Sequence, residues 1–486
     1  MSKKILINAR DAEECRVAIV AGQELEEFYL ESAAREITQG NIYKGVITRI
    51  EPSLQAVFVD YGAERHGFLQ RPEIHSDYFQ PNANEKSSLR NLVKKGQEML
   101  VQVTKDPIAA KGAMLTTFLS LPGRYAVLMP GSASQGISRK IENESERERI
   151  KDIITSMKLP DEYGLIIRTA GENCTKADLV RDIKSLQRLW LNIKSQVMKV
   201  PTPSLLFKDR NLAMRSVRDW LTPDVDEIMI DDPIVFEDVR EFVKLMTRKQ
   251  PKMVKFYDND QPLFTKYHLE DKVKTIFESR VKLKSGATIV IEQTEAMVTI
   301  DVNSGKSTQK NSVEATAFQT NMEAAAEIAR QLKLRDMGGL IVVDFIDMRE
   351  NSHRLEVEKN LRAHTKGDRA RTKVGRISSF GLLEMSRQRL HPSIEFGSFQ
   401  ECPCCKGKGL VLSTETLALA FLRRLSFDSS KTDAKLIRGI LPMEVASYLV
   451  NHKRRELSVI EDKQNVIIEI EASAKMYPGD SQIIYI

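Results

Sequence analysis

Two aspartates, Asp301 and Asp344, each lie near the end of a short apolar segment that is typical of a buried β-strand. An alanine-rich segment of helical character, residues 314–339, separates them, so the order is strand, helix, strand. Neighbouring parallel strands end at the same edge of a sheet, and we expect the two carboxylates to lie close together there. Nearby carboxylates repel each other and are commonly stabilised by a hard cation. The pattern therefore predicts a catalytic Mg²⁺ site.

A Mg²⁺ ion at this edge could bind a phosphate group, activate a water molecule and neutralise the leaving oxygen. Asn303, two residues after Asp301, is a candidate for holding the phosphate or orienting a ligand. Asp347 is a second acidic candidate in the segment of Asp344, residues 340–348, whose nearly continuous apolar run predicts a strand covered on both faces. The alternative is structural, with either aspartate capping the following helix or pairing with an arginine.

Three of the five cysteines, Cys402, Cys404 and Cys405, stand close together in the segment CPCCKGKG. A C-x-x-C turn directs two thiolates at one metal, but Zn²⁺ usually needs four ligands. The sequence has no second C-x-x-C and no matching histidine pair, so a symmetric dimer sharing one Zn²⁺ would complete the site. The alternative is a turn with free thiols. Cys15 and Cys174 have no partner pattern and are expected to be packing residues.

Short β-rich segments with turn residues between them predict a small β-barrel in residues 38–121. Exposed aromatic rings can stack on unpaired bases while lysines hold phosphates, which is how oligonucleotide-binding barrels bind single strands. Aromatic residues at alternate strand positions are also common in barrel cores, and this alternative is strongest for Phe58. The candidate RNA-binding residues are Phe58, Tyr61, Phe68, Lys105 and Lys111.

Arg168 and Thr169 stand side by side just before Gly171, after the apolar segment GLII. A guanidinium and a hydroxyl next to a glycine turn can bind a terminal phosphate. A surface pair without function is the alternative reading of the same residues.

The composition indicates a folded chain of several domains, because 42% of its 486 residues are hydrophobic and 29% are charged. No apolar run approaches the roughly 20 residues of a membrane span, and residues 1–10 lack the apolar core of a secretory signal. We therefore expect a cytoplasmic protein.

The net charge is +6, and residues 351–390 alone carry ten Lys or Arg against four Asp or Glu. That basic segment suits a phosphate backbone, or is solvated surface.

These pieces, in this order, resemble the ribonuclease E/G family over essentially the whole chain. The most specific motifs are AVFVDYGAERHGFL, LIIRTAG, IDVNSG, GGLIVVDFIDM, FGLLEMSRQRL and CPCCKGKG. The resemblance implies an α/β multidomain fold in which an S1-type OB barrel is inserted into an RNase H-like subdomain. The implied boundaries are 1–37 and 214–278 for the RNase H-like subdomain, 38–121 for the S1 domain, 122–213 for a 5′-sensor region, 279–400 for a DNase I-like catalytic subdomain, 401–410 for a zinc-link and 411–486 for a small dimerisation domain.

The resemblance also implies residue roles. Carried over position by position, it implies that Asp301 and Asp344 bind catalytic Mg²⁺ and that Asn303 assists them. It implies that Arg168 and Thr169, with the backbones of Gly123 and Val127, recognise a 5′-monophosphate. It also implies that Cys402 and Cys405 bind a Zn²⁺ shared by two subunits.

The function that we expect is an endoribonuclease that hydrolyses single-stranded RNA, prefers 5′-monophosphorylated ends and leaves a 5′-phosphate and a 3′-hydroxyl. Maturation of ribosomal RNA and turnover of messages are the family's expected tasks. Two alternatives are a non-catalytic RNA-binding or ribosome-associated protein and a dimeric zinc-linked scaffold. The sequence ends at Ile486 without a Pro/Arg-rich tail, which favours the G branch of the family.

Overall fold

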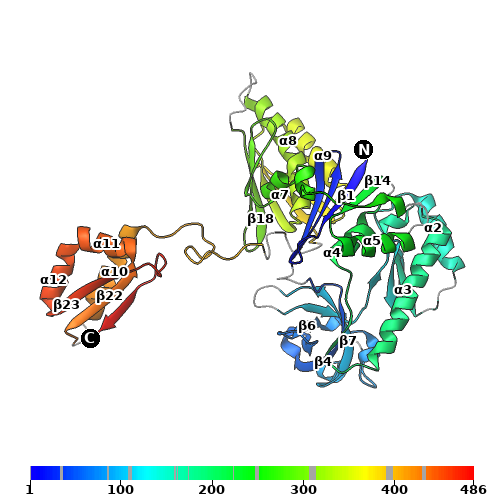
Figure 1. Ribbon diagram of the computed structural model, residues 1–486, viewed down its shortest axis with the longest axis horizontal. Coiled ribbons are helices and arrows are strands. Elements are labelled where there is room, and N and C mark those ends of the chain that lie inside the picture. The colour runs from blue at the N-terminus through cyan, green and yellow to red at the C-terminus, as the bar shows by residue number, and fades with distance from the viewer. Residues whose placement is uncertain are drawn as a thin grey trace. The chain divides into compact units, whose positions relative to one another are not determined.

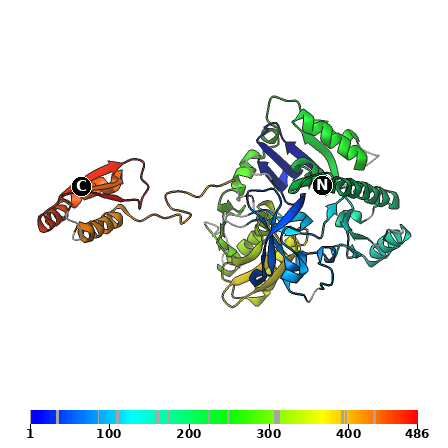
Figure 2. The same cartoon turned by 90° about the horizontal axis from the view of Figure 1, so that it is seen from below.

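The structure is a computed structural model that divides into two compact units, Met1–Phe396 and Gly397–Ile486. Figure 1 and Figure 2 show that each unit has its own sheets and helices. Lys111, one of the predicted RNA-binding residues, lies outside the described residues. The described residues are 2–32, 37–84, 87–107, 112–157, 160, 162–172, 174–222, 224–246, 251–305, 313–389, 394, 398–429 and 434–486.

A five-stranded mixed sheet joins segments that are far apart in the sequence. Its order is β15-β14-β1-β2-β3, with β1 parallel to β14 and antiparallel to β2. Helices α4 and α5 pack on one face, and α6 and α7 pack on the other. The elements are β1 (Lys3–Asn8), β2 (Glu14–Ala21), β3 (Glu24–Ser32), β14 (Val225–Ile230), β15 (Val254–Phe256), α4 (Leu212–Trp220), α5 (Pro233–Met246), α6 (Leu263–Lys266) and α7 (Glu270–Ile276).

The predicted β-barrel is confirmed as a closed barrel of five strands. Pairing of β4 with both β5 and β7 closes it, and β13 adds to β4 outside the barrel. The backbone at Gly67 lies so close to the side chain of Leu115 that a Cβ atom at Gly67 would be 2.3 Å from Leu115 Cδ1. The elements are β4 (Ile42–Glu51), β5 (Ala56–Asp60), β6 (Gly67–Gln70), α1 (Leu89–Leu92), β7 (Glu98–Lys105), β8 (Met114–Thr116) and β13 (Ser204–Phe207).

A four-stranded sheet of order β11-β12-β10-β9 follows the barrel, and two helices share its core. Each helix begins at a side-chain cap, since Asn143 accepts from Ser145 N at 3.1 Å and Thr175 accepts from Asp178 N at 3.2 Å. The elements are β9 (Leu121–Pro122), β10 (Ala126–Pro130), β11 (Gln135–Ile137), α2 (Glu144–Ser156), β12 (Tyr163–Ile167) and α3 (Lys176–Val197).

The six-stranded sheet that carries the two aspartates has the order β16-β17-β18-β19-β21-β20. Its buried face packs against α8 and α9, which lie together on one side of it (Figure 1). The elements are β16 (Arg280–Lys282), β17 (Thr288–Gln293), β18 (Met297–Asn303), α8 (Val313–Leu334), β19 (Gly339–Asp344), α9 (Asn351–Thr365), β20 (Thr372–Ile377) and β21 (Leu382–Arg387).

The prediction that the strand within residues 340–348 is covered on both faces is wrong. In β19, Ile341 and Val343 are buried, whereas Leu340 is 46% exposed. Both helices pack on the same face of the sheet, so the side chains that alternate with the buried ones face away from that core. We call this second side of the six-stranded sheet the open face.

The second unit is a three-stranded sheet of order β23-β22-β24 with three helices around its own core. Among the described helices, none is long and apolar enough to cross a membrane. The elements of this unit are α10 (Thr414–Ser429), β22 (Leu436–Pro442), α11 (Met443–His452), α12 (Arg454–Gln464), β23 (Ile467–Ser473) and β24 (Gln482–Tyr485).

A buried arginine, Arg387 at the end of β21, ties the six-stranded sheet to the segments that follow α8 and α9. Its Nε donates to Asp368 Oδ2 at 2.6 Å, and its Nη1 donates to Asp336 Oδ1 and to Met337 O, both at 2.8 Å. The Arg387 side chain is only 2% exposed. Removing one partner of such a buried ion pair leaves the other charge desolvated and unpaired.

We therefore expect Arg387→Gln to lower the free energy of unfolding by about 3–5 kcal/mol. Lys373→Gln, at an exposed position on β20, should change it by less than about 0.5 kcal/mol. The measurement is urea unfolding followed by tryptophan fluorescence, because the chain's two tryptophans, Trp190 and Trp220, both belong to the first unit. Equal stability of the two variants would contradict the assigned role of Arg387.

Candidate functional site

The structure brings Asp301 and Asp344 together. The strands β18 and β19 are parallel neighbours, and Asp301 is the register partner of Asp344. Both side chains are exposed on the open face, where each strand ends or nearly ends. The predicted strand, helix, strand order therefore places the two carboxylates side by side.

Asn303 lies at the end of β18 on the same face as Asp301. Its Nδ2 donates to Asp301 Oδ2 at 2.6 Å. This contact uses one of the two amide hydrogens and orients the Asp301 carboxylate. The second hydrogen and the amide oxygen are then the groups with which Asn303 can contact a ligand.

Within the described residues, no cationic side chain pairs with these carboxylates. Burial raises the pKa of Asp344, and the charges of Asp301 and Asp347 raise it further. Asp347 lies beyond the end of β19, where its Oδ1 would lie 3.1 Å from a Cβ atom at Gly381. Within the described residues, neither Asp301 nor Asp344 forms an ion pair with an arginine or lysine, so the pairing form of the structural alternative finds no support there. A cation would relieve the repulsion between the carboxylates.

The donor set fits a hard cation that keeps part of its water shell. Across the described part of the chain, no group of three or more His, Cys, Asp or Glu side chains is placed to hold a metal ion. Asp301 and Asp344 thus offer two carboxylates, and oxygen atoms of water or substrate would complete the shell. Mg²⁺ is usually bound in this way, through one or two carboxylates, waters and phosphate oxygens.

A buried amide, which the sequence analysis missed, holds the loop that follows Asp344. Asn321 of α8 is fully buried, and its Nδ2 donates to Ile346 O at 2.7 Å. Ile346 N in turn donates to Asn321 Oδ1 at 3.0 Å. The Asn321 side chain therefore pairs with the backbone as a neighbouring strand would, and it fixes the path of the chain between Asp344 and Asp347. A polar residue inside an alanine-rich helix is the sequence signal that could have revealed it.

A carboxylate at the start of α8 holds the far end of the same loop. Glu314 accepts from Arg349 N at 3.0 Å, from Glu350 N at 3.2 Å and from His353 Nδ1 at 2.9 Å. The Arg349 N–H, followed by His353, lowers the pKa of Glu314 to about 2. The ring of His353 also stacks on Phe318, with centroids 4.3 Å apart.

The predicted phosphate-binding residues come from two neighbouring strands of the four-stranded sheet. Gly123 lies in the turn between β9 and β10, Val127 lies on β10, and Arg168 and Thr169 follow β12, which pairs with β10. Arg168 Nη1 donates to Gly123 O at 2.8 Å. Thr169 Oγ1 lies 3.1 Å from Ser138 Oγ. The four predicted residues are therefore clustered.

Asp219, at the end of α4, is a further residue of this cluster that the sequence analysis missed. Its Oδ1 lies 2.8 Å from Arg168 Nη1 and 3.1 Å from Arg218 Nε. Burial would raise the pKa of Asp219, but the two guanidinium groups outweigh it and hold that pKa well below its usual range. Arg369 donates to the backbone oxygen of Asp219, and its guanidinium lies 3.5 Å from the ring centroid of Trp220. The predicted phosphate site thus contacts the segment just before β20.

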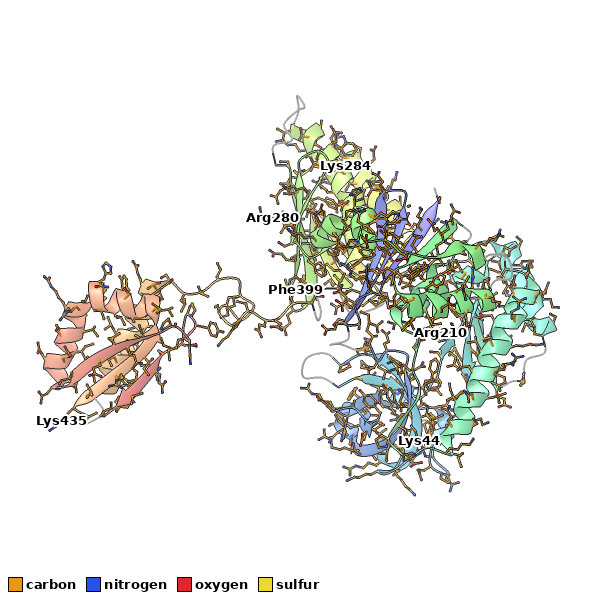
Figure 3. The ribbon with its side chains drawn as sticks, in the orientation of Figure 1. Lys44, Arg210, Arg280, Lys284, Phe399 and Lys435 are labelled. Atoms are coloured by element: carbon orange, nitrogen blue, oxygen red, sulfur yellow. The ribbon has the colours of Figure 1, made fainter. Side chains whose placement is uncertain are left out.

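A cavity of about 230 Å³ lies beside Gly123, lined by both carboxylate and guanidinium groups. Arg124, Asp182 and Arg210 belong to its lining, and Figure 3 labels Arg210. Asp182 accepts from the backbone N–H groups of Tyr125 at 2.8 Å and Arg124 at 3.2 Å. Gly123 lines this cavity whereas Arg168 and Thr169 do not, so the cavity adjoins their cluster at Gly123.

The barrel residues divide into surface and core. Phe58 and Phe68 are register partners on β5 and β6, half-buried, with ring centroids 5.7 Å apart. The guanidinium of Arg49 lies 4.5 Å from the Phe58 centroid. Lys105 is exposed at the end of β7.

Tyr61 is a correction to the predicted RNA-binding set. It is 3% exposed in the barrel core, where its ring lies edge-on to Tyr43 at 5.0 Å. Burial raises the pKa of Tyr61 to about 12. A ring inside the core has no free face on which a base could stack.

The cysteine turn has the backbone geometry of a thiolate loop. Backbone N–H groups of Cys405 and Cys404 lower the pKa of the Cys402 thiol, whereas burial raises the pKa of Cys404. Lys406 N donates to Cys402 O at 2.8 Å and closes the turn. The Cys402 thiol therefore loses its proton more readily than the Cys404 thiol, and the thiolate is the form that metals bind. Cys15 and Cys174 pack in apolar cores, as predicted.

Much of the basic segment 351–390 serves the protein itself. Arg387 lies in the buried ion pairs described above, and Arg354 donates to Met348 O at 2.9 Å. Arg362 donates to Gly375 O at 2.7 Å, and Arg389 donates to Gly338 O at 2.8 Å. The local excess of positive charge is therefore a weaker sign of RNA binding than the count of residues indicated.

Three families match consecutive parts of the chain. The family described as "Ribonuclease E/G family" matches residues 120–390, and "S1 RNA binding domain" matches residues 36–106. The description "RNase E/G, Thioredoxin-like domain" matches residues 401–485. The S1 match covers β4, β5, β6 and β7, four of the five strands of the closed barrel.

Curated proteins with similar sequences carry the names ribonuclease E and ribonuclease G. Ribonuclease E of Haemophilus influenzae is 46% identical over 98% of this chain and 51% of its own length. Ribonuclease E of Escherichia coli K12 is 45% identical over 95% of this chain and 44% of its own length. Ribonuclease G of Escherichia coli K12 is 38% identical over 87% of this chain and 88% of its own length.

The chain thus spans about half the length of these ribonuclease E relatives. Identity to them is higher than to ribonuclease G, so the comparisons do not assign the chain to the G branch. The family itself is settled by a match to more than half of the chain and by a relative that the chain covers over 88% of its length. The chain belongs to the ribonuclease E/G family.

Proposed function

We propose that this chain is an endoribonuclease that hydrolyses single-stranded RNA with the help of Mg²⁺. The main support is that Asp301 and Asp344 are register partners near the carboxyl ends of two neighbouring parallel strands, on the open face. The names of the relatives support the same activity. The proposed products are a 5′-phosphate and a 3′-hydroxyl, with ribosomal RNA and messages as substrates.

Asp301 and Asp344 would hold the metal ion, since they are exposed, adjacent and without a cationic partner among the described residues. When bound there, Mg²⁺ would supply a Lewis acid for the phosphate and lower the pKa of a water molecule. Asn303 orients the Asp301 carboxylate and can donate its second amide hydrogen to a phosphate oxygen. The clamp of Asn321 on Ile346 keeps the loop after Asp344 in place.

The bond changes define the products. A new bond forms between the oxygen of a water molecule and the phosphorus atom, and the bond between phosphorus and the 3′ oxygen breaks. The 3′ oxygen takes up a proton and becomes a hydroxyl, so the phosphate stays on the 5′ side of the downstream fragment.

The cluster of Arg168 and Thr169 is the proposed binding site for a 5′-monophosphate. A guanidinium and a hydroxyl are suitable donors to a terminal phosphate. The backbone of Val127 lies on the neighbouring strand β10, and that of Gly123 lies in the turn before it. In the structure Asp219 binds Arg168, so a phosphate would compete with that carboxylate or share the guanidinium with it.

The proposed architecture assigns the five-stranded mixed sheet to an RNase H-like subdomain and the six-stranded sheet to a DNase I-like subdomain. In the barrel, Phe58, Phe68 and Lys105 are the described residues proposed to bind single-stranded RNA. The cysteine turn would be a zinc-link between two subunits of a homodimer, and the cytoplasmic location stays a prediction.

Asp301→Asn and Asp344→Asn are each expected to slow Mg²⁺-dependent cleavage of a short A/U-rich single-stranded RNA by about a thousandfold or more, because each removes one charged ligand. RNA binding should survive, since neither carboxylate attracts a polyanion. The control is Glu356→Gln, which removes an exposed carboxylate from α9 on the helical side of the sheet. Turnover retained in both aspartate variants would overturn the catalytic assignment, and binding without cleavage by the wild type would leave an RNA-binding protein.

Arg168→Gln should abolish faster cleavage of RNA with a 5′-monophosphate compared with RNA carrying a 5′-hydroxyl. The rate on the 5′-hydroxyl RNA should stay within about twofold of wild type, because that substrate does not use the site. Arg188→Gln, at an exposed arginine on α3, is the matched control. If the wild type cleaves both RNAs at the same rate, the proposed phosphate site is wrong while the nuclease assignment stands.

Cys402→Ser and Cys405→Ser should each reduce bound zinc from one ion per two chains to near zero and convert dimers to monomers. Cys404→Ser should keep both, because Cys404 lies inside the C-x-x-C of Cys402 and Cys405, and adjacent residues rarely both reach one tetrahedral ion. Metal analysis and light scattering of the purified full chain measure the two properties. A zinc-loaded dimer in the Cys402 variant would contradict the shared site.

A further inference from the structure

The open face of the six-stranded sheet presents a cation in the same row as the two carboxylates. Arg280 on β16 pairs with Val290, which pairs with Asp301, which pairs with Asp344. Register partners on neighbouring strands point their side chains to the same face. One row across four strands therefore begins at Arg280 and ends at Asp344.

The next row places a second cation in line with Asn303. Lys282 pairs with Thr288, which pairs with Asn303. Along β16, Arg280 and Lys282 are exposed while Val281 between them is buried, so the two cations share the open face.

The exposed positions continue at Lys284 in the turn after β16. Figure 3 labels Arg280 and Lys284 in this part of the six-stranded sheet. Within the described part of the chain, Arg280, Lys282 and Lys284 form no ion pair and no side-chain hydrogen bond. They differ in this from the arginines of residues 351–390, many of which bind backbone oxygens or buried carboxylates. Three uncommitted cations beside a nuclease-type carboxylate pair are complementary to a polyanion.

The spacing separates these cations from the metal-binding carboxylates. Neighbouring strands lie about 4.8 Å apart, so the backbone of Arg280 is roughly 10 Å from that of Asp301 and roughly 14 Å from that of Asp344. A phosphate held at the carboxylates and a phosphate held at β16 are therefore different phosphates of one strand. Glu292, on the same face of β17 but one row beyond Arg280, would repel a phosphate and so limits the track to the rows of Asp301 and Asn303.

We propose that Arg280 and Lys282 hold backbone phosphates of single-stranded RNA that flank the scissile phosphate, so that the substrate crosses the open face from Asp301 and Asp344 toward β16. This inference rests on the proposed nuclease function and adds a binding track to it. The contacts are to the backbone, so they strengthen binding for all sequences alike and give no base preference.

The test combines Arg280→Gln and Lys282→Gln in the full chain and measures RNA binding in the Asp301→Asn background, where cleavage does not interfere. Binding is expected to weaken about tenfold at moderate salt, and the slope of log affinity against log salt should fall by roughly 1.4, or about 0.7 per lost phosphate contact. In the cleaving enzyme the same pair should raise KM and leave kcat within about twofold. The matched control is Lys274→Gln with Lys359→Gln, which removes two exposed cations from the helices α7 and α9.

A neutral methylphosphonate scan of the RNA locates the phosphates. One or two neutral linkages near the cleavage site should weaken binding to the Asp301→Asn protein but add nothing when Arg280 and Lys282 are also replaced by Gln. An unchanged salt slope, an equal loss in the control pair, or a scan without any such position would overturn the track. Because the binding arm does not depend on cleavage, failure of the nuclease assignment would appear separately, as absence of products with the wild type.

Discussion

The parallel pairing of β18 with β19 is the constraint on which the site depends. It puts two carboxylates, Asp301 and Asp344, at the same level of one sheet edge, although like charges at that distance oppose folding. The sheet tolerates them because its other face is packed against α8 and α9, whose apolar core supplies the stabilisation. A cation would then be attracted by an arrangement that the hydrophobic core has already assembled.

Three sets of polar contacts hold the loops around the site against the packed helices and sheet. Asn321 holds the loop after Asp344 from within α8, and Glu314 holds the end of that loop by its backbone N–H groups. Arg387 fixes the last turns after both helices through Asp336 and Asp368. In each contact a charged or amide side chain forms hydrogen bonds with its partner. These hydrogen bonds favour one conformation of the loop over similar alternatives.

Sequence patterns were sufficient for the closed barrel, for the parallel strands around α8 and for the meeting of Asp301 with Asp344. They were insufficient where the burial of a residue depends on which elements pack against it in the folded protein. Leu340 is apolar but exposed, and Tyr61 is beside a polar loop but buried. Asn321 and its partner Ile346 are 25 residues apart, and the contact exists only once α8 has docked on the sheet. Local periodicity carries no information on such pairs, whereas the motifs of the family located the residues at the open ends of strands.

The position of β16 at the margin of its sheet has a consequence for association. A marginal strand presents a row of unpaired backbone N–H and C=O groups, which can recruit a strand from another molecule. Alternate positions of β16 carry Arg280 and Lys282, and a second copy that docked strand to strand would bring like charges together. The side chains proposed to bind a polyanion would thus also disfavour strand-to-strand association of two copies, so replacing them by neutral residues would remove both effects.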